Sequence, residues 1–96
     1  MPPPEQRRIS WLGEQPYAHR GLHREGVPEN SRAAAEGAIA AGMGIECDIQ
    51  MSRDLVPLVF HDWELDRLTD ARGKVAARPA DELCRIRLMD TEQTIW

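Results

Sequence analysis

Two apolar runs separated by a short polar stretch constrain the fold of this chain most strongly. Residues 44–50 alternate between apolar and polar side chains, which is typical of a strand with one buried face. A second apolar run covers residues 55–60 and follows a turn signal at residues 52–54. Only about six residues separate Gln50 from Pro57, whereas a crossover between parallel strands needs about a dozen or more. The two runs are therefore predicted to form an antiparallel hairpin.

The turn sets the register of this hairpin. With Arg53 and Asp54 as the central turn residues, the predicted opposed pairs are Gln50 with Pro57, Asp48 with Val59, and Glu46 with His61. Because opposed residues share a face, Glu46, Asp48 and His61 are predicted to line one face of the hairpin. The other face would carry Cys47, Ile49, Leu58 and Phe60. A slip of one residue would move His61 to the opposite face.

Further elements are predicted on both sides of the hairpin. Residues 16–19 are expected to form a buried strand that leads into a loop at residues 21–30. Residues 31–41 are rich in alanine, follow the capping candidates Asn30 and Ser31, and end at Gly42, so they are predicted to form a helix. Residues 63–77 are expected to form a structured loop. Residues 78–89 are expected to start a second helix whose inward-packing residues are Leu83, Cys84 and Ile86.

Length and charge narrow the function classes. A chain of 96 residues makes at most one domain, here an irregular lead-in at residues 1–15 followed by a domain at 16–96. With 12 lysines and arginines against 16 aspartates and glutamates, the net charge is -4, so nucleic acid is not an expected partner. Cys47 and Cys84 match no metal-ligand spacing and are expected to be reduced packing residues.

The apolar stretches also bear on location. The longest ones are well short of the roughly 18 residues that a membrane helix needs, so no membrane span is expected. The N-terminal segment MPPPEQRRIS has no apolar core of the kind found in a signal peptide. A cytoplasmic location is therefore predicted.

Two groups of residues could carry chemistry. Glu46 and Asp48 together with His61 suit a hard divalent cation such as Mg²⁺ or Ca²⁺, with the imidazole as a general acid or base. His19 and Arg20, followed by a glycine, could supply a second acid or base and a phosphate anchor. Taken singly, each of these residues is more often a solvated side chain or part of a turn, so only their combination is informative.

Five motifs in this order resemble the N-terminal part of glycerophosphodiester phosphodiesterases. They are AHRG at residues 18–21, PENS at 28–31, GIECDIQMSRD at 44–54, VPLVFHDWELDRLT at 56–69 and GKV at 73–75. The resemblance covers roughly residues 17–88. The more distant phosphatidylinositol-specific phospholipases C share the layout of two histidines around an E-x-D pair.

This resemblance implies an α/β fold, the N-terminal portion of a (β/α)₈ TIM barrel with an antiparallel hairpin after the second strand. It also implies metal-dependent hydrolysis of glycerophosphodiesters to sn-glycerol 3-phosphate and an alcohol. By the family pattern, His19 and His61 would be the general base and the general acid, Arg20 would bind the phosphoryl oxygens, and Glu46 and Asp48 would bind Mg²⁺ or Ca²⁺. Glu29 and Asn30 of the PEN motif are expected nearby in a supporting role.

Departures from the family pattern leave a second reading open. Leu55 stands where the family usually has glycine, and Ser31 replaces a commoner threonine. A barrel of this type needs about 250 residues, so 96 are too few to close it alone. The family's third acidic ligand and a lysine at the phosphate come from later strands. The alternative is therefore a catalytically inactive fragment that binds metal or phosphate weakly, with self-association through incomplete barrel edges.

Overall fold

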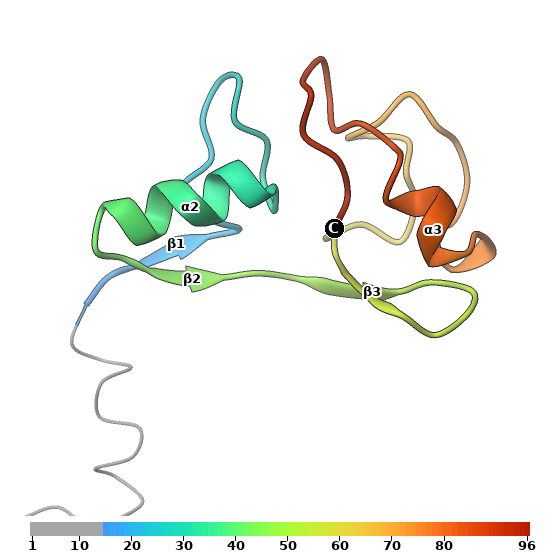
Figure 1. Cartoon of the computed structure of the whole chain (residues 1–96), viewed down its shortest axis with the longest axis horizontal. Coiled ribbons are helices and arrows are strands. Elements are labelled where there is room, and N and C mark those ends of the chain that lie inside the picture. The colour runs from blue at the N-terminus through green and yellow to red at the C-terminus, as the bar shows by residue number, and fades with distance from the viewer. Residues whose placement is uncertain (1–14) are drawn as a thin grey trace, which may run out of the picture.

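The computed structural model describes residues 15–96, so most of the predicted lead-in lies outside the described residues. In chain order the elements are β1 (Tyr17–His19), α2 (Arg32–Ala40), β2 (Gly44–Glu46), β3 (Ile49–Met51), β4 (Pro57–Val59), the 3₁₀ helix η2 (Val75–Ala77) and α3 (Ala80–Leu83). They form two lobes, joined by the chain that runs from β2 into β3 (Figure 1). The strands of residues 15–96 form two two-stranded sheets and no closed barrel.

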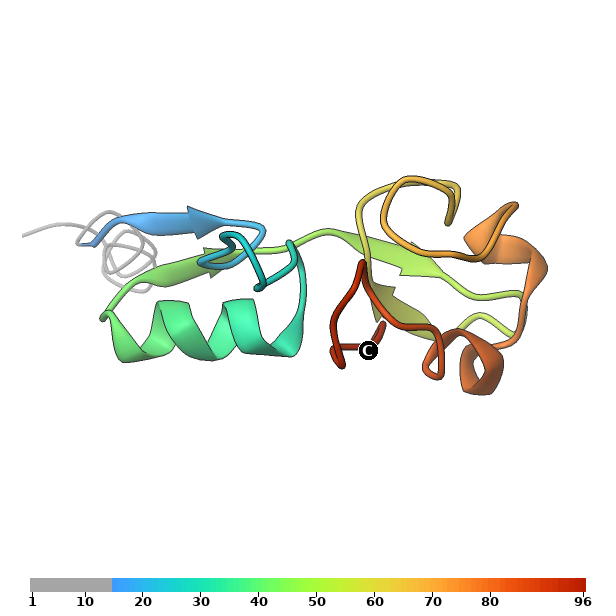
Figure 2. The same cartoon turned by 90° about the horizontal axis from the view of Figure 1, so that it is seen from above.

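The first lobe is a β-α-β unit. β1 and β2 are parallel, and their register places Tyr17 beside Gly44 and His19 beside Glu46. Helix α2 lies along one side of this strand pair (Figure 2). Ala18 is buried, whereas Tyr17 and His19 are exposed, so the expectation of a fully buried first strand is wrong. His19 is thereby left open to solvent at the end of β1.

Helix α2 begins and ends close to the predicted positions. The Ser31 hydroxyl accepts a hydrogen bond from the Ala34 N–H at 3.1 Å and donates one to the Pro28 carbonyl at 2.7 Å, so Ser31 is the N-cap. Asn30, the other capping candidate, instead takes a left-handed conformation with φ of 57°. At the other end, Gly42 has φ of 72°, which is the usual stop signal of a helix.

The predicted antiparallel hairpin is confirmed, but its predicted register is wrong by one residue. The observed pairs are Ile49 with Val59, Gln50 with Leu58, and Met51 with Pro57. The turn contains three residues rather than two, because Leu55 adopts φ of 64° and the chain closes with a hydrogen bond from the Ser52 N–H to the Val56 carbonyl at 3.0 Å. A left-handed third residue is typical of three-residue hairpin loops.

The shifted register changes which side chains share a face. The Phe60 N–H donates to the Asp48 carbonyl at 2.9 Å, so Phe60 rather than the predicted Val59 continues the ladder beside Asp48. His61 therefore does not stand opposite Glu46 on one hairpin face. Leu58 and Phe60 are buried as predicted, whereas the residues predicted to join them, Cys47 and Ile49, are exposed.

The second lobe is built around the hairpin and the loops that follow it. Its core consists of Leu58, Phe60, Leu65, Leu68, Val75, Leu83, Leu88 and Ile95. The predicted second helix is only the single turn α3, and Cys84 is exposed rather than packed inward. Leu83 does point into the core, and Ile86 packs against it. Both cysteines are free, as predicted, but neither is a packing residue.

Candidate active site

The turn after β1 directs two of the predicted site residues. Arg20 and Gly21 both have positive φ, 59° and 79°, and so reverse the chain directly after His19. A Cβ atom at Gly21 would lie 2.7 Å from the Ala34 Cβ, so the close approach of this turn to α2 requires glycine. His19 is left at the end of β1, beside Glu46 at the end of β2.

Arg20 contacts both predicted metal-binding carboxylates. Its backbone N–H donates to Glu46 Oε1 at 3.3 Å, and its side-chain Nε lies 3.5 Å from Asp48 Oδ2. This Nε atom is buried and has no hydrogen-bond partner within the described part of the chain. A buried cationic donor without an acceptor is costly, and an anionic ligand would supply the missing acceptor.

Asn30 fixes the position of Asp48. The Asn30 amide donates from Nδ2 to Asp48 Oδ2 at 3.1 Å, and Asn30 Oδ1 accepts from the Asp48 N–H at 3.4 Å. Asn30 is buried, and its left-handed backbone is one that asparagine tolerates better than most residues. Asn30, which was expected near the site, thus makes a two-point contact with Asp48.

An ion-pair network runs from Arg20 to His61. Arg20 Nη1 donates to Glu29 Oε2 at 2.9 Å. Arg67 donates to both oxygens of Glu29, each at 2.9 Å, and to both oxygens of Asp62, at 2.8 and 3.0 Å. The hydrogen bonds from Arg67 lower the pKa of Glu29, together with the nearby charges of both arginines and despite partial burial. Glu29 is therefore a carboxylate at neutral pH.

His61 ends this network. Its Nδ1 lies 2.6 Å from Asp62 Oδ1. The Arg67 hydrogen bonds, followed by the one with His61, lower the pKa of Asp62 to about 2. Because Asp62 is charged at neutral pH and can only accept, Nδ1 of His61 must be the donor. Nε2 is then the ring nitrogen that can exchange a proton with another molecule.

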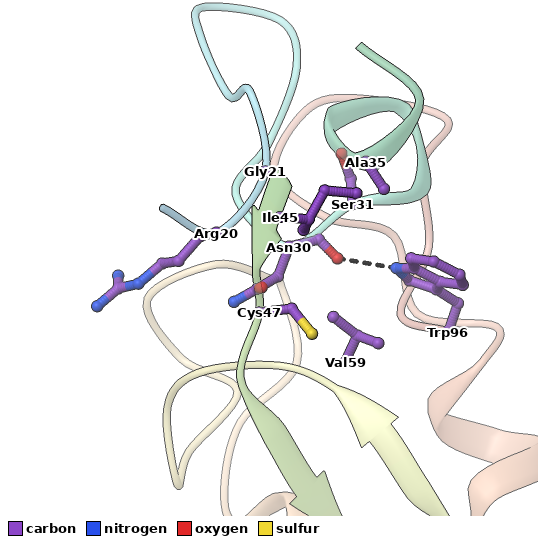
Figure 3. A pocket seen from close by; sticks show the side chains of 9 residues that line it. All are labelled: Arg20, Gly21, Asn30, Ser31, Ala35, Ile45, Cys47, Val59 and Trp96. Carbon is purple, nitrogen blue, oxygen red and sulfur yellow. Dashed lines mark hydrogen bonds between the residues drawn. The ribbon is translucent and has the colours of Figure 1, made fainter. Parts of the chain in front are cut away.

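A cavity of about 220 Å³ opens between the two lobes. Its wall is mainly apolar, with Ile45, Cys47, Val59 and Trp96 facing it, and Asn30 at its side (Figure 3). The Trp96 indole N–H donates to the Asn30 carbonyl at 2.8 Å and so joins the C-terminal segment to the PEN loop. The Arg20 side chain points away from this cavity (Figure 3).

The structure brings some predicted site residues together and leaves others apart. Arg20, Glu46 and Asp48 are in direct contact. His61 is joined to Arg20 only through the ion-pair network, and the His19 side chain makes no hydrogen bond to another residue in the 15–96 range. Within these described residues, no group of three or more histidine, cysteine, aspartate or glutamate side chains is placed to hold a metal ion.

Two residues of the network were not singled out from the sequence. Asp62 directly follows His61, and Arg67 lies five residues beyond Asp62, both inside the motif HDWELDR. A signal was present, because an acidic residue beside a candidate catalytic histidine is a usual partner for Nδ1. No local sequence pattern indicates the role of Arg67, because its second partner, Glu29, is 38 residues away in sequence.

Comparison with known proteins identifies the protein family in which these motifs occur together. A sequence model described as the glycerophosphoryl diester phosphodiesterase family matches residues 19–95, which include every residue of the network. The chain belongs to the glycerophosphoryl diester phosphodiesterase family. The match places the HRG turn, the PEN loop, the E-x-D strand and the HD motif within one family pattern.

Several relatives of this family are similar to the chain over part of their length. A glycerophosphodiester phosphodiesterase of Bacillus altitudinis is 40% identical over 70 residues, which are 72% of this chain and 28% of the relative. Glycerophosphodiester phosphodiesterase 1 of Homo sapiens is 41% identical over 59 residues, 60% of this chain and 18% of the relative. The chain thus spans less than a third of these relatives.

Solved glycerophosphodiester phosphodiesterases share its fold. The enzyme of Agrobacterium tumefaciens matches with a TM-score of 0.78 and 31% identity, over 85% of this chain and 38% of that one. An Oleispira antarctica phosphodiesterase, solved in complex with the product sn-glycerol-3-phosphate, matches with a TM-score of 0.75 and 29% identity, over 88% of this chain and 37% of that one. The solved relatives are TIM-barrel proteins, and this chain covers part of that fold.

One further property follows from the helices. None of those in residues 15–96 combines the length and the apolar character that crossing a membrane would require.

Proposed function

We propose that this chain carries the N-terminal half-site of an enzyme that hydrolyses glycerophosphodiesters to sn-glycerol 3-phosphate and an alcohol. The observation that carries this proposal is the contact of Arg20 with both Glu46 and Asp48, which joins a phosphate anchor to a pair of carboxylates. The product bound to the Oleispira antarctica relative supports this class of substrate. In fold terms, the chain would be the N-terminal portion of the barrel, with its hairpin after the second strand.

The carboxylates fit a divalent metal ion in the chemistry of their donors. Glu46 and Asp48 offer hard oxygens, which Mg²⁺ and Ca²⁺ prefer. Asn30 and Arg20 both approach Oδ2 of Asp48, so Oδ1 has no hydrogen-bond partner among residues 15–96. These two residues would supply two ligands, and a bound ion would stabilise the negative charge on the phosphoryl oxygens.

Arg20 and the histidines would act on the substrate itself. Arg20 Nε, which makes no hydrogen bond within residues 15–96, is suited to a phosphoryl oxygen, whose charge it would stabilise. His19 would take a proton from the attacking water as general base. His61, as an imidazolium, would give its Nε2 proton to the leaving alcohol oxygen as the phosphorus–oxygen bond breaks. Asp62 keeps the Nδ1 proton in place throughout.

The test is release of sn-glycerol 3-phosphate from glycerophosphocholine by the purified chain with Mg²⁺ or Ca²⁺. The His61→Ala variant is expected to lose about 10²-fold or more of the activity, since general acid–base catalysis contributes at least that much. His23→Ala is the matched control, because His23 is an exposed histidine of a loop. Equal release by the wild type and His61→Ala would refute the role of His61.

A second candidate is a chain that binds a metal ion or phosphate weakly and does not hydrolyse the substrate. It is favoured by the lack of a three-residue metal-binding group in the described 15–96 segment. Titration calorimetry with Mg²⁺ and Ca²⁺ separates the two candidates. Binding that disappears in Glu46→Gln, without product release by the wild type, would support the second candidate and count against hydrolysis by this chain.

Self-association and a cytoplasmic location remain proposals. Ile49 and Met51, two residues apart on β3, are 53% and 43% exposed. Within the described residues β3 pairs only with β4, so its other edge is available to another copy of the chain. Sedimentation velocity is expected to detect a dimer or larger species, and a compact monomer at all concentrations would contradict this.

A further inference from the structure

One guanidinium group joins two separate parts of the candidate site. Arg67 binds Glu29, in the loop between β1 and α2, through Nη1 and Nη2, both at 2.9 Å. It binds Asp62, which follows β4, through Nε at 2.8 Å and Nη2 at 3.0 Å. Both contacts are two-point contacts. Such forked pairs fix the direction of each carboxylate as well as its distance.

Each of these carboxylates holds a residue of the proposed mechanism. Glu29 Oε2 also accepts from Arg20 Nη1 at 2.9 Å. Asp62 Oδ1 also accepts from His61 Nδ1 at 2.6 Å. Arg67 is thus one contact removed from the phosphate anchor on one side and from the acid–base imidazole on the other. No direct contact between Arg20 and His61 occurs among the described residues, so this chain of contacts is what relates them.

The network differs from an ordinary surface ion pair. Exposed pairs of single contacts contribute little, because water screens them and the long side chains lose freedom. Here the Glu29 side chain is only 11% exposed and that of Asp62 23% exposed, although Arg67 itself is 49% exposed. The positive charge of the shared arginine offsets the repulsion between the two carboxylates. The pKa of Arg67 is raised by the hydrogen bonds that it donates to Glu29 and Asp62, so it stays charged at every relevant pH.

We propose that Arg67 is a positioning residue that fixes His61 in the Nδ1–H form through Asp62 and holds Arg20 in place through Glu29. Its catalytic meaning rests on the proposed function, because with Nδ1 held by Asp62 the proton that a His61 imidazolium gives to a leaving group must come from Nε2. The arrangement itself does not depend on turnover. It can therefore be tested in the absence of substrate and metal.

The test is the tautomer of His61 in the full chain, read from long-range proton–nitrogen correlation spectra. The spectra are recorded at a pH at which the two ring-nitrogen signals themselves report a neutral imidazole. In the wild type, Nδ1 of His61 is expected to give the signal of a protonated ring nitrogen. In Arg67→Met this signal is expected to move toward that of an unprotonated nitrogen, because Asp62 loses the group that directs it.

Two further variants make the result specific. Arg67→Lys keeps the positive charge but cannot fork to both carboxylates, so it is expected to show an intermediate shift. Arg72→Met is the matched control, since Arg72 is 78% exposed and pairs with Asp66 at 3.4 Å, outside the network. It is expected to leave the His61 signals unchanged.

The outcomes separate this proposal from the proposed function. An unchanged His61 tautomer in folded Arg67→Met and Arg67→Lys would overturn the positioning role, whether or not the wild type hydrolyses the substrate. A lost tautomer preference without any hydrolysis would support the positioning role and refute only the activity. Unfolding of both Arg67 variants beside a folded Arg72→Met would overturn the proposal as well, because Arg67 would then stabilise the fold rather than position His61.

Discussion

Leu55 offers the sharpest test of how the hairpin acquires its register. The residue occupies the left-handed third position of the turn, with φ of 64°, and its side chain is 75% exposed. A left-handed conformation costs an ordinary L-residue about 1–2 kcal/mol, and glycine avoids this cost. Glycine also increases the freedom of the unfolded chain, which costs about 0.4–1 kcal/mol. Because little of the Leu55 side chain is buried, few contacts are lost on substitution.

The expected net effect of Leu55→Gly is therefore a stabilisation of about 0.5–1 kcal/mol. For a chain of this size, that raises the midpoint of thermal unfolding by about 2–8 °C. The measurement is unfolding by heat and by urea, monitored by circular dichroism. Leu55→Ala is the matched control, because it removes the same side chain but retains the unfavourable backbone conformation. A Leu55→Gly variant less stable than Leu55→Ala would refute this explanation of the turn, and with it the physical reason given for the register.

Three further predictions follow from the site. Asn30→Ala is expected to lower the free energy of unfolding by about 2 kcal/mol, because it removes both contacts with Asp48 from a buried position. Urea unfolding measures this change, with Asn30→Gly, which tolerates the same backbone conformation, as the comparison. A change under about 0.5 kcal/mol, roughly the smallest net contribution of one hydrogen bond, would contradict the prediction. The folded pKa of Asp62, about 2, is below its unfolded value of about 3.9. Its contribution to stability is thus complete above about pH 4 and is lost as the pH falls toward 2. The difference in urea midpoint between wild type and Asp62→Asn should narrow as the pH falls across that window. A constant difference would contradict a lowered pKa of Asp62 in the folded chain. Cys47 and Cys84 are both free and exposed, so the native chain is expected to react with two equivalents of a thiol reagent without denaturant; a lower stoichiometry would contradict their exposure.

Local features of the sequence were sufficient for several elements. Helix α2 was predictable because its capping serine, its alanine-rich body and Gly42 all act within a few residues of each other. The hairpin was predictable because the connection is too short for a crossover. In each case the deciding interaction lies inside a short segment, which is the part of the structure that a sequence pattern can report.

The register and the exposure of Cys47 could not be predicted in the same way. Two-residue and three-residue turns are both compatible with the segment Ser52 to Leu55, and only a backbone angle at Leu55 separates them. One extra turn residue moves every later side chain to the other face. The prediction that His61 would face Glu46 was wrong for this reason alone.

The chemical identity of the site was determined by the sequence itself. The HRG, PEN, E-x-D and HD motifs carry the histidines, carboxylates and arginine within short stretches, and the family match spans all of them. What only the tertiary structure decided is how they are connected: Arg20 reaches Asp48 across 28 residues, and Arg67 reaches Glu29 across 38. Such contacts depend on how the two lobes pack and on which carboxylates become partly buried. No local pattern encodes that packing, because the energy of each ion pair is set by partners and solvent exposure that exist only in the folded chain.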